Sequence, residues 1–491
     1  MTAGTIHIVL LSHTNVGKTT LARTLLRKDI GAVIDRAHVT EVAEPHVAMR
    51  TATGDEMLLW DTPGFGDSAR LLRRLEQSGQ PIGWFLSQVW DRIADRPFWS
   101  SQQALRAARD QADVLLYVVN ATEGPDSAGY AAPELQILRW LGKPALVLVN
   151  QLGTRADANH DAAIVRQWQA ALEAQAPGVA SQVLPFDAFA RCWMQEHALL
   201  AAIAACIDPA QRMTYDRIVQ AWRERDSGIL RRSAIVLAEQ LAELARDEEV
   251  VTQGPLIDKA RRWIVQASGR GDGAGAGEQR ARDALARRLD EAVKRSTSAL
   301  VELHGLTGSA GEVLLRRMGG EFDTRRAADA DRATLLGGIV TGALSGVAAD
   351  LAAGGLTFGA GAVLGGVAGA LGARKLTQLY NAERGASHDT VRWSDEFLDA
   401  RLESAVIRYL AVAHFGRGRG EFQPAEPAEQ WSYAIKAALQ AAASQHARAW
   451  PALRSGDGDA MRRLCAMIEQ VLLETLARLY PGAALHFKTR Q

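Results

Sequence analysis

A phosphate-binding pattern lies near the N-terminus, between an apolar run and an amphipathic stretch. Residues 12–19 read SHTNVGKT, which is a Walker A loop with serine in place of its first glycine. In such a loop the backbone N–H groups wrap the phosphates, and the positive end of the following helix adds to their attraction. We expect Lys18 to reach the β- and γ-phosphates and the Thr19 hydroxyl to hold Mg²⁺. The predicted nucleotide-binding residues of this loop are Ser12, Asn15, Val16, Gly17, Lys18, Thr19 and Thr20.

A second phosphate motif follows at the end of another apolar run. Residues 58–64 read LLWDTPG, an apolar strand pattern that ends in Asp-x-x-Gly. Asp61 is predicted to hold Mg²⁺ through water, and the Gly64 N–H to sense a γ-phosphate. Two independent phosphate motifs in this order predict a nucleotide-binding protein.

Apolar runs separated by helical patterns surround both motifs. The runs lie at residues 5–11, 46–50, 57–60, 114–119, 145–149 and 182–184, with amphipathic stretches such as 19–27 and 162–174 between them. Continuous Val, Ile and Leu runs that alternate with helices are typical of a parallel sheet buried on both faces. We therefore predict that residues 1–205 form an α/β P-loop NTPase domain with a doubly wound, mostly parallel sheet.

Strand patterns nearly vanish after residue 205, and an all-α domain is predicted for the remainder. Leu230, Ala234, Leu237, Leu241 and Leu244 have the spacing of a helical seam, and residues 285–303 repeat it. Such a seam packs against a partner helix. Further helices are predicted over residues 394–413, 428–447 and 459–480. The helical domain is divided into a first part, 206–334, and a C-terminal part, 374–491, by a glycine-rich segment.

The glycine-rich segment, residues 335–373, carries only one charged residue, Asp350. Two sets of its glycines recur every four residues: Gly338, Gly342 and Gly346, then Gly361, Gly365 and Gly369. This small-xxx-small pattern predicts a closely packed helical hairpin. As a helix, residues 335–349 would extend about 22 Å, which is shorter than the hydrocarbon core of about 30 Å. Two interpretations stay open: a hairpin that inserts into a membrane, which we favour, and a buried hairpin in a soluble bundle.

Composition narrows the class of protein. The 491 residues contain 56 Lys+Arg and 56 Asp+Glu, so no excess positive charge is present to coat nucleic acid, and no nucleic-acid partner is expected. The three cysteines are widely spaced, which argues against a disulfide framework or a zinc site and fits a reducing cytosol. The predicted location is cytoplasmic, at the inner face of the cell membrane.

Asn15 in the loop and residues 61–64 together resemble the Era-like (TrmE-Era-septin) branch of P-loop GTPases. Most of the chain is similar to a bacterial family in which this G domain is fused to a C-terminal helical domain of unknown function. The resemblance implies GTP and GDP as ligands and Mg²⁺ as cofactor, held by Thr19, Asp61 and a switch threonine, for which we choose Thr40. It also implies Lys18, Thr40 and Gly64 as catalytic residues, and Asn15 as a candidate ligand for K⁺.

The sequence departs from this family at the base-reading motif and at a catalytic position. Asn150 is retained after the strand at 145–149, but Gln151 replaces the usual lysine and Gly153 the usual aspartate. Asn150 and Gln151 are therefore predicted nucleotide-binding residues, and ATP is not excluded as the ligand. Asp187 is either a replacement carboxylate or, as we favour, a helix N-cap. Phe65 stands where a glutamine would orient water, which predicts slow intrinsic hydrolysis.

Three hypotheses of function follow. The first is a GTPase switch for a membrane-associated helical effector domain. The second is a dynamin-like protein that remodels membranes by self-assembly, and the third is a non-hydrolysing module that assembles a partner complex. A homodimer through the G domain or the heptad helices is a predicted assembly.

Overall fold

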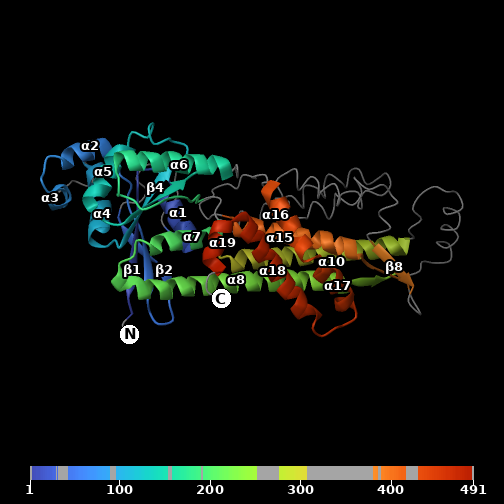
Figure 1. Cartoon of the computed structure of the whole chain (residues 1–491). Helices are drawn as coiled ribbons and strands as arrows, with labels where there is room; N and C mark the ends of the chain where they lie inside the picture. The colour runs from blue at the N-terminus through green and yellow to red at the C-terminus, as the bar shows by residue number, and fades with distance from the viewer. Residues whose placement is uncertain are drawn as a thin grey trace. The chain divides into compact units, whose positions relative to one another are not determined.

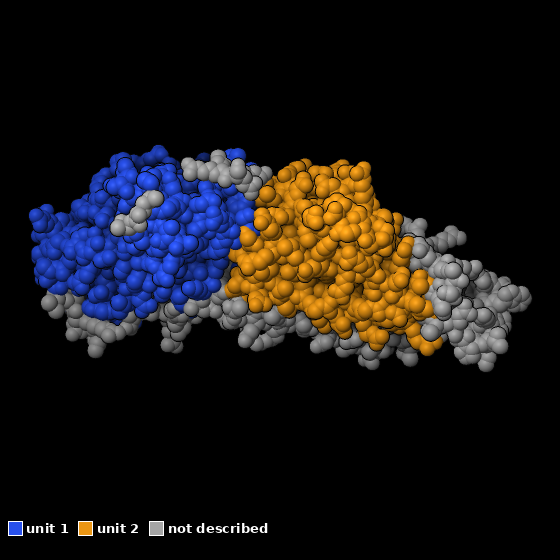
Figure 2. Space-filling view, turned by 90° about the horizontal axis from the view of Figure 1, so that it is seen from below, with its two compact units in different colours: residues 1–227, 413–420, 480–491 blue, residues 228–412, 421–479 orange. Residues whose placement is uncertain are grey.

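The computed structural model describes residues 3–28, 30, 42–88, 95–152, 158–188, 192–251, 276–306, 380–384, 389–415 and 429–488. The predicted hairpin at 335–373, Thr40 and Gly153 lie outside these residues. The chain divides into two compact units (Figure 2). Unit 1 comprises Met1–Ser227, Ala413–Gly420 and Tyr480–Gln491, and unit 2 comprises Gly228–Val412 and Glu421–Leu479.

Unit 1 is built on a six-stranded sheet with the strand order β2-β3-β1-β4-β5-β6. The strands are β1 (Thr5–Ser12), β2 (Glu44–Arg50), β3 (Glu56–Asp61), β4 (Val114–Asn120), β5 (Ala145–Asn150) and β6 (Val183–Pro185). The edge strand β2 runs antiparallel to β3, and the other neighbouring strands are parallel. The six apolar runs of the sequence thus become the six strands, and the prediction of a mostly parallel sheet is confirmed.

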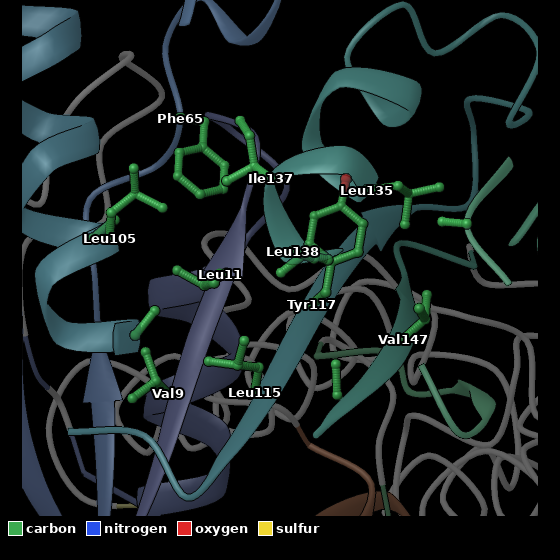
Figure 3. Packing of buried hydrophobic residues seen from close by; sticks show 14 of the residues in the cluster. Val9, Leu11, Phe65, Leu105, Leu115, Tyr117, Leu135, Ile137, Leu138 and Val147 are labelled. Atoms are coloured by element: carbon green, nitrogen blue, oxygen red, sulfur yellow. The ribbon is translucent and has the colours of Figure 1, made fainter. Parts of the chain in front are cut away.

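Helices cover both faces of this sheet (Figure 1). They are α1 (Lys18–Leu26), α2 (Ser68–Leu75), α3 (Pro81–Ser87), α4 (Arg96–Asp110), α5 (Ala131–Leu141), α6 (Ala158–Gln175), α7 (Trp193–Ala204) and α19 (Pro481–Lys488), with the part of α8 (Arg212–Arg246) that lies in unit 1. One buried cluster joins Leu21, Leu200 and Trp222 of α1, α7 and α8. A second cluster joins residues of α2 to α6 (Figure 3).

Unit 2 is mostly helical, as predicted. Besides the remainder of α8, it contains α10 (Ala276–Leu303), α15 (Asp395–Ala413), α16 (Glu429–Ala441), α17 (Ala443–Arg454) and α18 (Ala460–Leu479). Leu237 and Leu241 of α8 and Leu285 and Leu289 of α10 are fully buried, as the heptad spacing predicted. Within the described residues, no helix combines the length and apolarity needed to cross a membrane.

Two details of unit 2 differ from the prediction. The expected helix over 428–447 is two helices, α16 and α17, with a break at Ala442. The expected all-α composition is also incomplete, because β7 (Glu248–Val250), β9 (Asp389–Trp393) and β8 (Tyr380–Arg384) form a three-stranded antiparallel sheet. These strands are short and rich in charged residues, so they carry no apolar run that predicts a strand.

The seam of α8 allows a matched test of the unit 2 core. Leu241 is fully buried, whereas Ile235 on the same helix is 37% exposed. Leu241→Ala should lower the free energy of unfolding by about 2–5 kcal/mol because it leaves a cavity, and Ile235→Ala by less than about 1 kcal/mol. Thermal unfolding of both variants measures the difference; equal midpoints would contradict the packing of this seam.

Candidate nucleotide-binding site

The predicted phosphate motifs meet at one edge of the unit 1 sheet. β1 ends at Ser12, β3 at Asp61 and β5 at Asn150, and α1 begins at Lys18 directly after the loop. The carboxyl ends of parallel strands and the N-terminus of a following helix are where α/β proteins bind nucleotides. The strand–loop–helix arrangement that the Walker A motif requires is therefore present.

The loop between β1 and α1 turns through two residues with left-handed backbone conformation. Asn15 has φ +64° and Gly17 has φ +92°. A Cβ atom on Gly17 would also lie 2.7 Å from the side-chain nitrogen of Asn150, so glycine is required there by backbone conformation and by space. Ser12, which replaces the first glycine of the motif, accepts a hydrogen bond of 2.9 Å from the Lys18 ammonium.

Lys18 is a buried cation at the centre of the site. Burial lowers the pKa of its ammonium, and the negative charges of Asp61 and Glu134 act in the opposite direction. A buried ammonium is stabilised by nearby anionic groups. Lys18 thus lies buried at the lysine position of the Walker A motif, beside two acidic residues and bonded to Ser12.

Thr19 and Asp61 form a pair of oxygen donors beside the loop. The Thr19 hydroxyl donates a 2.8 Å hydrogen bond to the Asp61 carboxylate, which joins the first turn of α1 to the end of β3. Mg²⁺ prefers oxygen ligands and keeps several waters, taking only one or two groups from the protein and the rest from phosphates. These two side chains fit that donor set. Thr20, also predicted here, is buried in the first turn of α1.

Asn150 holds the loop in place. Its side-chain nitrogen donates to the Val16 carbonyl at 2.8 Å, and its side-chain oxygen accepts from the Ala188 backbone N–H at 2.9 Å. The next residue, Gln151, donates to the Asn15 carbonyl at 3.4 Å. The two predicted nucleotide-binding residues that follow β5 therefore contact the backbone of the phosphate loop.

The segment after β3 lies against the same loop. A Cβ atom on Gly64 would lie 2.9 Å from the Thr14 Cα, which explains the glycine. Phe65 is fully buried, and its ring points into the cluster that contains Leu11 and Leu105 (Figure 3). The residue at the position of a water-orienting glutamine thus belongs to the hydrophobic core.

Two site predictions need comment. Thr40, predicted as a switch, catalytic and Mg²⁺ residue, lies outside the described residues. The favoured interpretation of Asp187 as a helix N-cap is wrong, because the helix that follows, α7, begins at Trp193 with Cys192 as its N-cap. Asp187 instead lies in the loop after β6, beside the Ala188 N–H that bonds Asn150.

Sequence reasoning missed one buried residue of this region, Glu134. Its carboxylate is fully buried in the first turn of α5, where it accepts a hydrogen bond of 2.9 Å from the Tyr117 hydroxyl. His13 of the phosphate loop and Ser68 of α2 contact the same carboxylate. The available signal is a single acidic residue within residues 131–138, which are apolar except for Glu134 and Gln136.

The fold and the site define an α/β P-loop GTPase domain followed by a mostly helical region. Residues 7–151 match the family described as 50S ribosome-binding GTPase. Residues 179–471, more than half of the chain, match the family described as Domain of unknown function (DUF3482), and the chain belongs to that family. The resemblance to an Era-like G domain fused to a domain of unknown function is thus confirmed.

Solved structures of Era are among the similar folds. One is Era in complex with MgGDPNP and nucleotides 1506–1542 of 16S ribosomal RNA, at 16% identity and a TM-score of 0.32, covering 62% of this chain and 90% of that chain. Another is an Aquifex aeolicus Era variant bound to GDP.AlF4⁻, at 16% identity and a TM-score of 0.30, covering 61% of this chain and 90% of that chain. No protein with a curated function matches the sequence.

The contacts of Asn150 predict its importance for nucleotide affinity. Asn150→Ala leaves the Val16 carbonyl and the Ala188 N–H without their side-chain partner and releases the loop, so we expect GDP affinity to fall at least about tenfold. Asn120 also ends a strand of the sheet, and its side-chain oxygen accepts hydrogen bonds from Thr122 of its own loop. Asn120→Ala should change the affinity by less than about threefold; fluorescent-nucleotide titration compares the two, and equal losses would contradict this role.

Proposed function

We propose that this protein is a Mg²⁺-dependent GTPase switch with slow intrinsic hydrolysis, whose nucleotide state controls its helical region. The observation that carries the proposal is the convergence of Lys18, Thr19 and Asp61 at the N-terminus of α1. Lys18 and the loop N–H groups bind phosphate, and Thr19 and Asp61 orient the metal ion. When bound, Mg²⁺ neutralises charge that develops on the phosphates.

Slow hydrolysis follows from the groups near the phosphates. Phe65 is fully buried and has no hydrogen-bonding side-chain group that could orient the attacking water. A fast reaction then needs a group from a partner or from the residues around Thr40. A K⁺ ion at Asn15 and a homodimer remain proposals of the same kind, taken from the resemblance.

Contacts at the far end of α1 support a link between the nucleotide site and the first part of the family domain of unknown function. Arg27, directly after α1, lies 3.2 Å from Glu196 of α7 and 2.9 Å from Asp226 of α8. Both acidic residues fall within residues 179–471, the part that matches the domain of unknown function. The chain segment that contains Thr40 begins just beyond Arg27. The end of α1, which precedes that segment in the sequence, is therefore paired with residues of the family domain.

Loss of Lys18 tests the proposed function. Lys18→Ala should weaken GTP and GDP binding at least about a hundredfold, because the buried cation that faces the phosphates is removed. Lys143→Ala is the control: the Lys143 ammonium donates to the Ala112 carbonyl, and its loss should leave affinity unchanged. The titrations are done with guanine and adenine nucleotides, and phosphate release is followed with and without Mg²⁺ and K⁺. Unchanged affinity in Lys18→Ala would refute the nucleotide site.

We also propose that residues 335–373 contact a membrane from the cytoplasmic side. The glycine register and the basic residues on both flanks, among them Arg332 and Arg374, support this proposal. Wild-type protein should float with liposomes that contain anionic lipid, and a variant lacking residues 335–373 should stay in the soluble fraction. Equal partitioning of the two proteins would refute membrane contact. Nothing in the described residues favours the self-assembling, dynamin-like alternative.

A further inference from the structure

A buried carboxylate joins three elements around the phosphate loop. Glu134 of α5 is fully buried, and its two oxygens have different partners. One oxygen accepts a 2.9 Å hydrogen bond from the Tyr117 hydroxyl of β4. The other accepts a short hydrogen bond from the hydroxyl of Ser68, the first residue of α2, and lies 2.9 Å from the His13 ring nitrogen.

His13 and Ser68 contact this carboxylate from two segments with different predicted roles. His13 is the second residue of the phosphate loop, and its ring stacks on that of Tyr130 with 4.5 Å between centroids. Ser68 follows Gly64 and Phe65, the segment predicted to sense the γ-phosphate. One carboxylate therefore holds the phosphate loop and the end of the sensing segment together.

The backbone of the sensing segment is docked on the same loop. The Phe65 N–H donates to the Ser12 carbonyl at 3.0 Å, and the Thr14 N–H donates to the Phe65 carbonyl at 3.1 Å. Gly64 lies against Thr14, with no room for a Cβ atom. The segment is thus fixed by backbone pairing at Phe65 and by the carboxylate at Ser68.

We propose that Glu134 is a positioning residue that favours this docked arrangement, so that GTP, but not GDP, has to compete with it. The inference rests on the proposed GTPase function. A γ-phosphate is sensed when the backbone N–H of Gly64 turns toward it, which moves residues 64–68 relative to the loop. GDP has no γ-phosphate, so its binding does not require this movement.

The chemistry of the carboxylate explains why it stabilises one arrangement. A buried carboxylate is costly unless donors surround it, and Glu134 has donors from β4 and α2 with His13 beside them. Burial, together with the charge of Glu134, raises the pKa of Tyr117, so its phenol remains a donor. If Ser68 moves away, the carboxylate loses one of these partners. Because the carboxylate keeps all of these partners only in the docked arrangement, that arrangement is favoured over the GTP-bound one.

The ratio of two affinities tests this inference. In Ser68→Ala, which removes one hydroxyl, the affinity for a non-hydrolysable GTP analogue should rise roughly tenfold relative to the affinity for GDP. This is the size expected when a hydrogen bond to a carboxylate is lost from only one of two states. Glu134→Gln, which keeps the side-chain shape but removes the charge, should shift the ratio in the same direction. Isothermal titration of both nucleotides with the full-length protein measures it.

Tyr117→Phe is the matched control. It removes a donor to the same carboxylate without touching the phosphate loop or the sensing segment, so it should lower the thermal midpoint and leave the GTP-to-GDP ratio unchanged. An unchanged or lowered ratio in Ser68→Ala, or a ratio that shifts equally in Tyr117→Phe, would overturn the inference. Failure of the wild type to bind either nucleotide would instead refute the proposed function.

Discussion

The arrangement of the nucleotide site depends on the hydrogen bonds of the Asn150 side-chain amide. It bonds the Val16 carbonyl of the phosphate loop with its nitrogen and the Ala188 N–H of the loop after β6 with its oxygen. Three segments that are far apart in sequence are held by one planar group. The close approach of Asn150 is also what excludes a Cβ atom from residue 17. The glycine of the phosphate motif and the asparagine of the base motif therefore form one packing constraint.

The hydrogen bond between Asn150 and Ala188 joins the parts of the chain that match the two families. The GTPase match ends at residue 151, and the match to the domain of unknown function begins at residue 179. The second match supplies β6 and Ala188, together with Leu200 and Trp222 of the core under the sheet. The α/β unit accordingly extends through Ser227. In physical terms, the first part of the domain of unknown function completes the fold of the GTPase domain.

Features set by residues close together in the sequence were predicted, and features set by contacts between distant residues were missed. All six strands of unit 1 were predictable from short local runs of the sequence; β1, β4 and β5 are almost entirely buried, whereas the edge strand β2 is largely exposed. The sheet of unit 2 was not, because β7 is charged and its pairing of Glu248 with Arg392 spans much of the chain. In the site, Lys18, Thr19 and Asp61 were found because a local motif carries them. Glu134 was missed because its partners come from three other elements and no short spacing marks it.

Charge is arranged differently at the two ends of α1. At the C-terminal end, the partly exposed Arg27 and Arg225 face the buried Glu196 and Asp226. Although burial raises the pKa of Asp226, the two arginines hold it below its ordinary range, so the set is already compensated. At the N-terminal end, burial lowers the pKa of Lys18 despite two nearby carboxylates, so a phosphate adds compensation there. The two ends of α1 therefore differ in charge balance: the acidic residues at the far end are already paired with arginines, whereas the phosphate loop is the end at which an added negative charge would be stabilised.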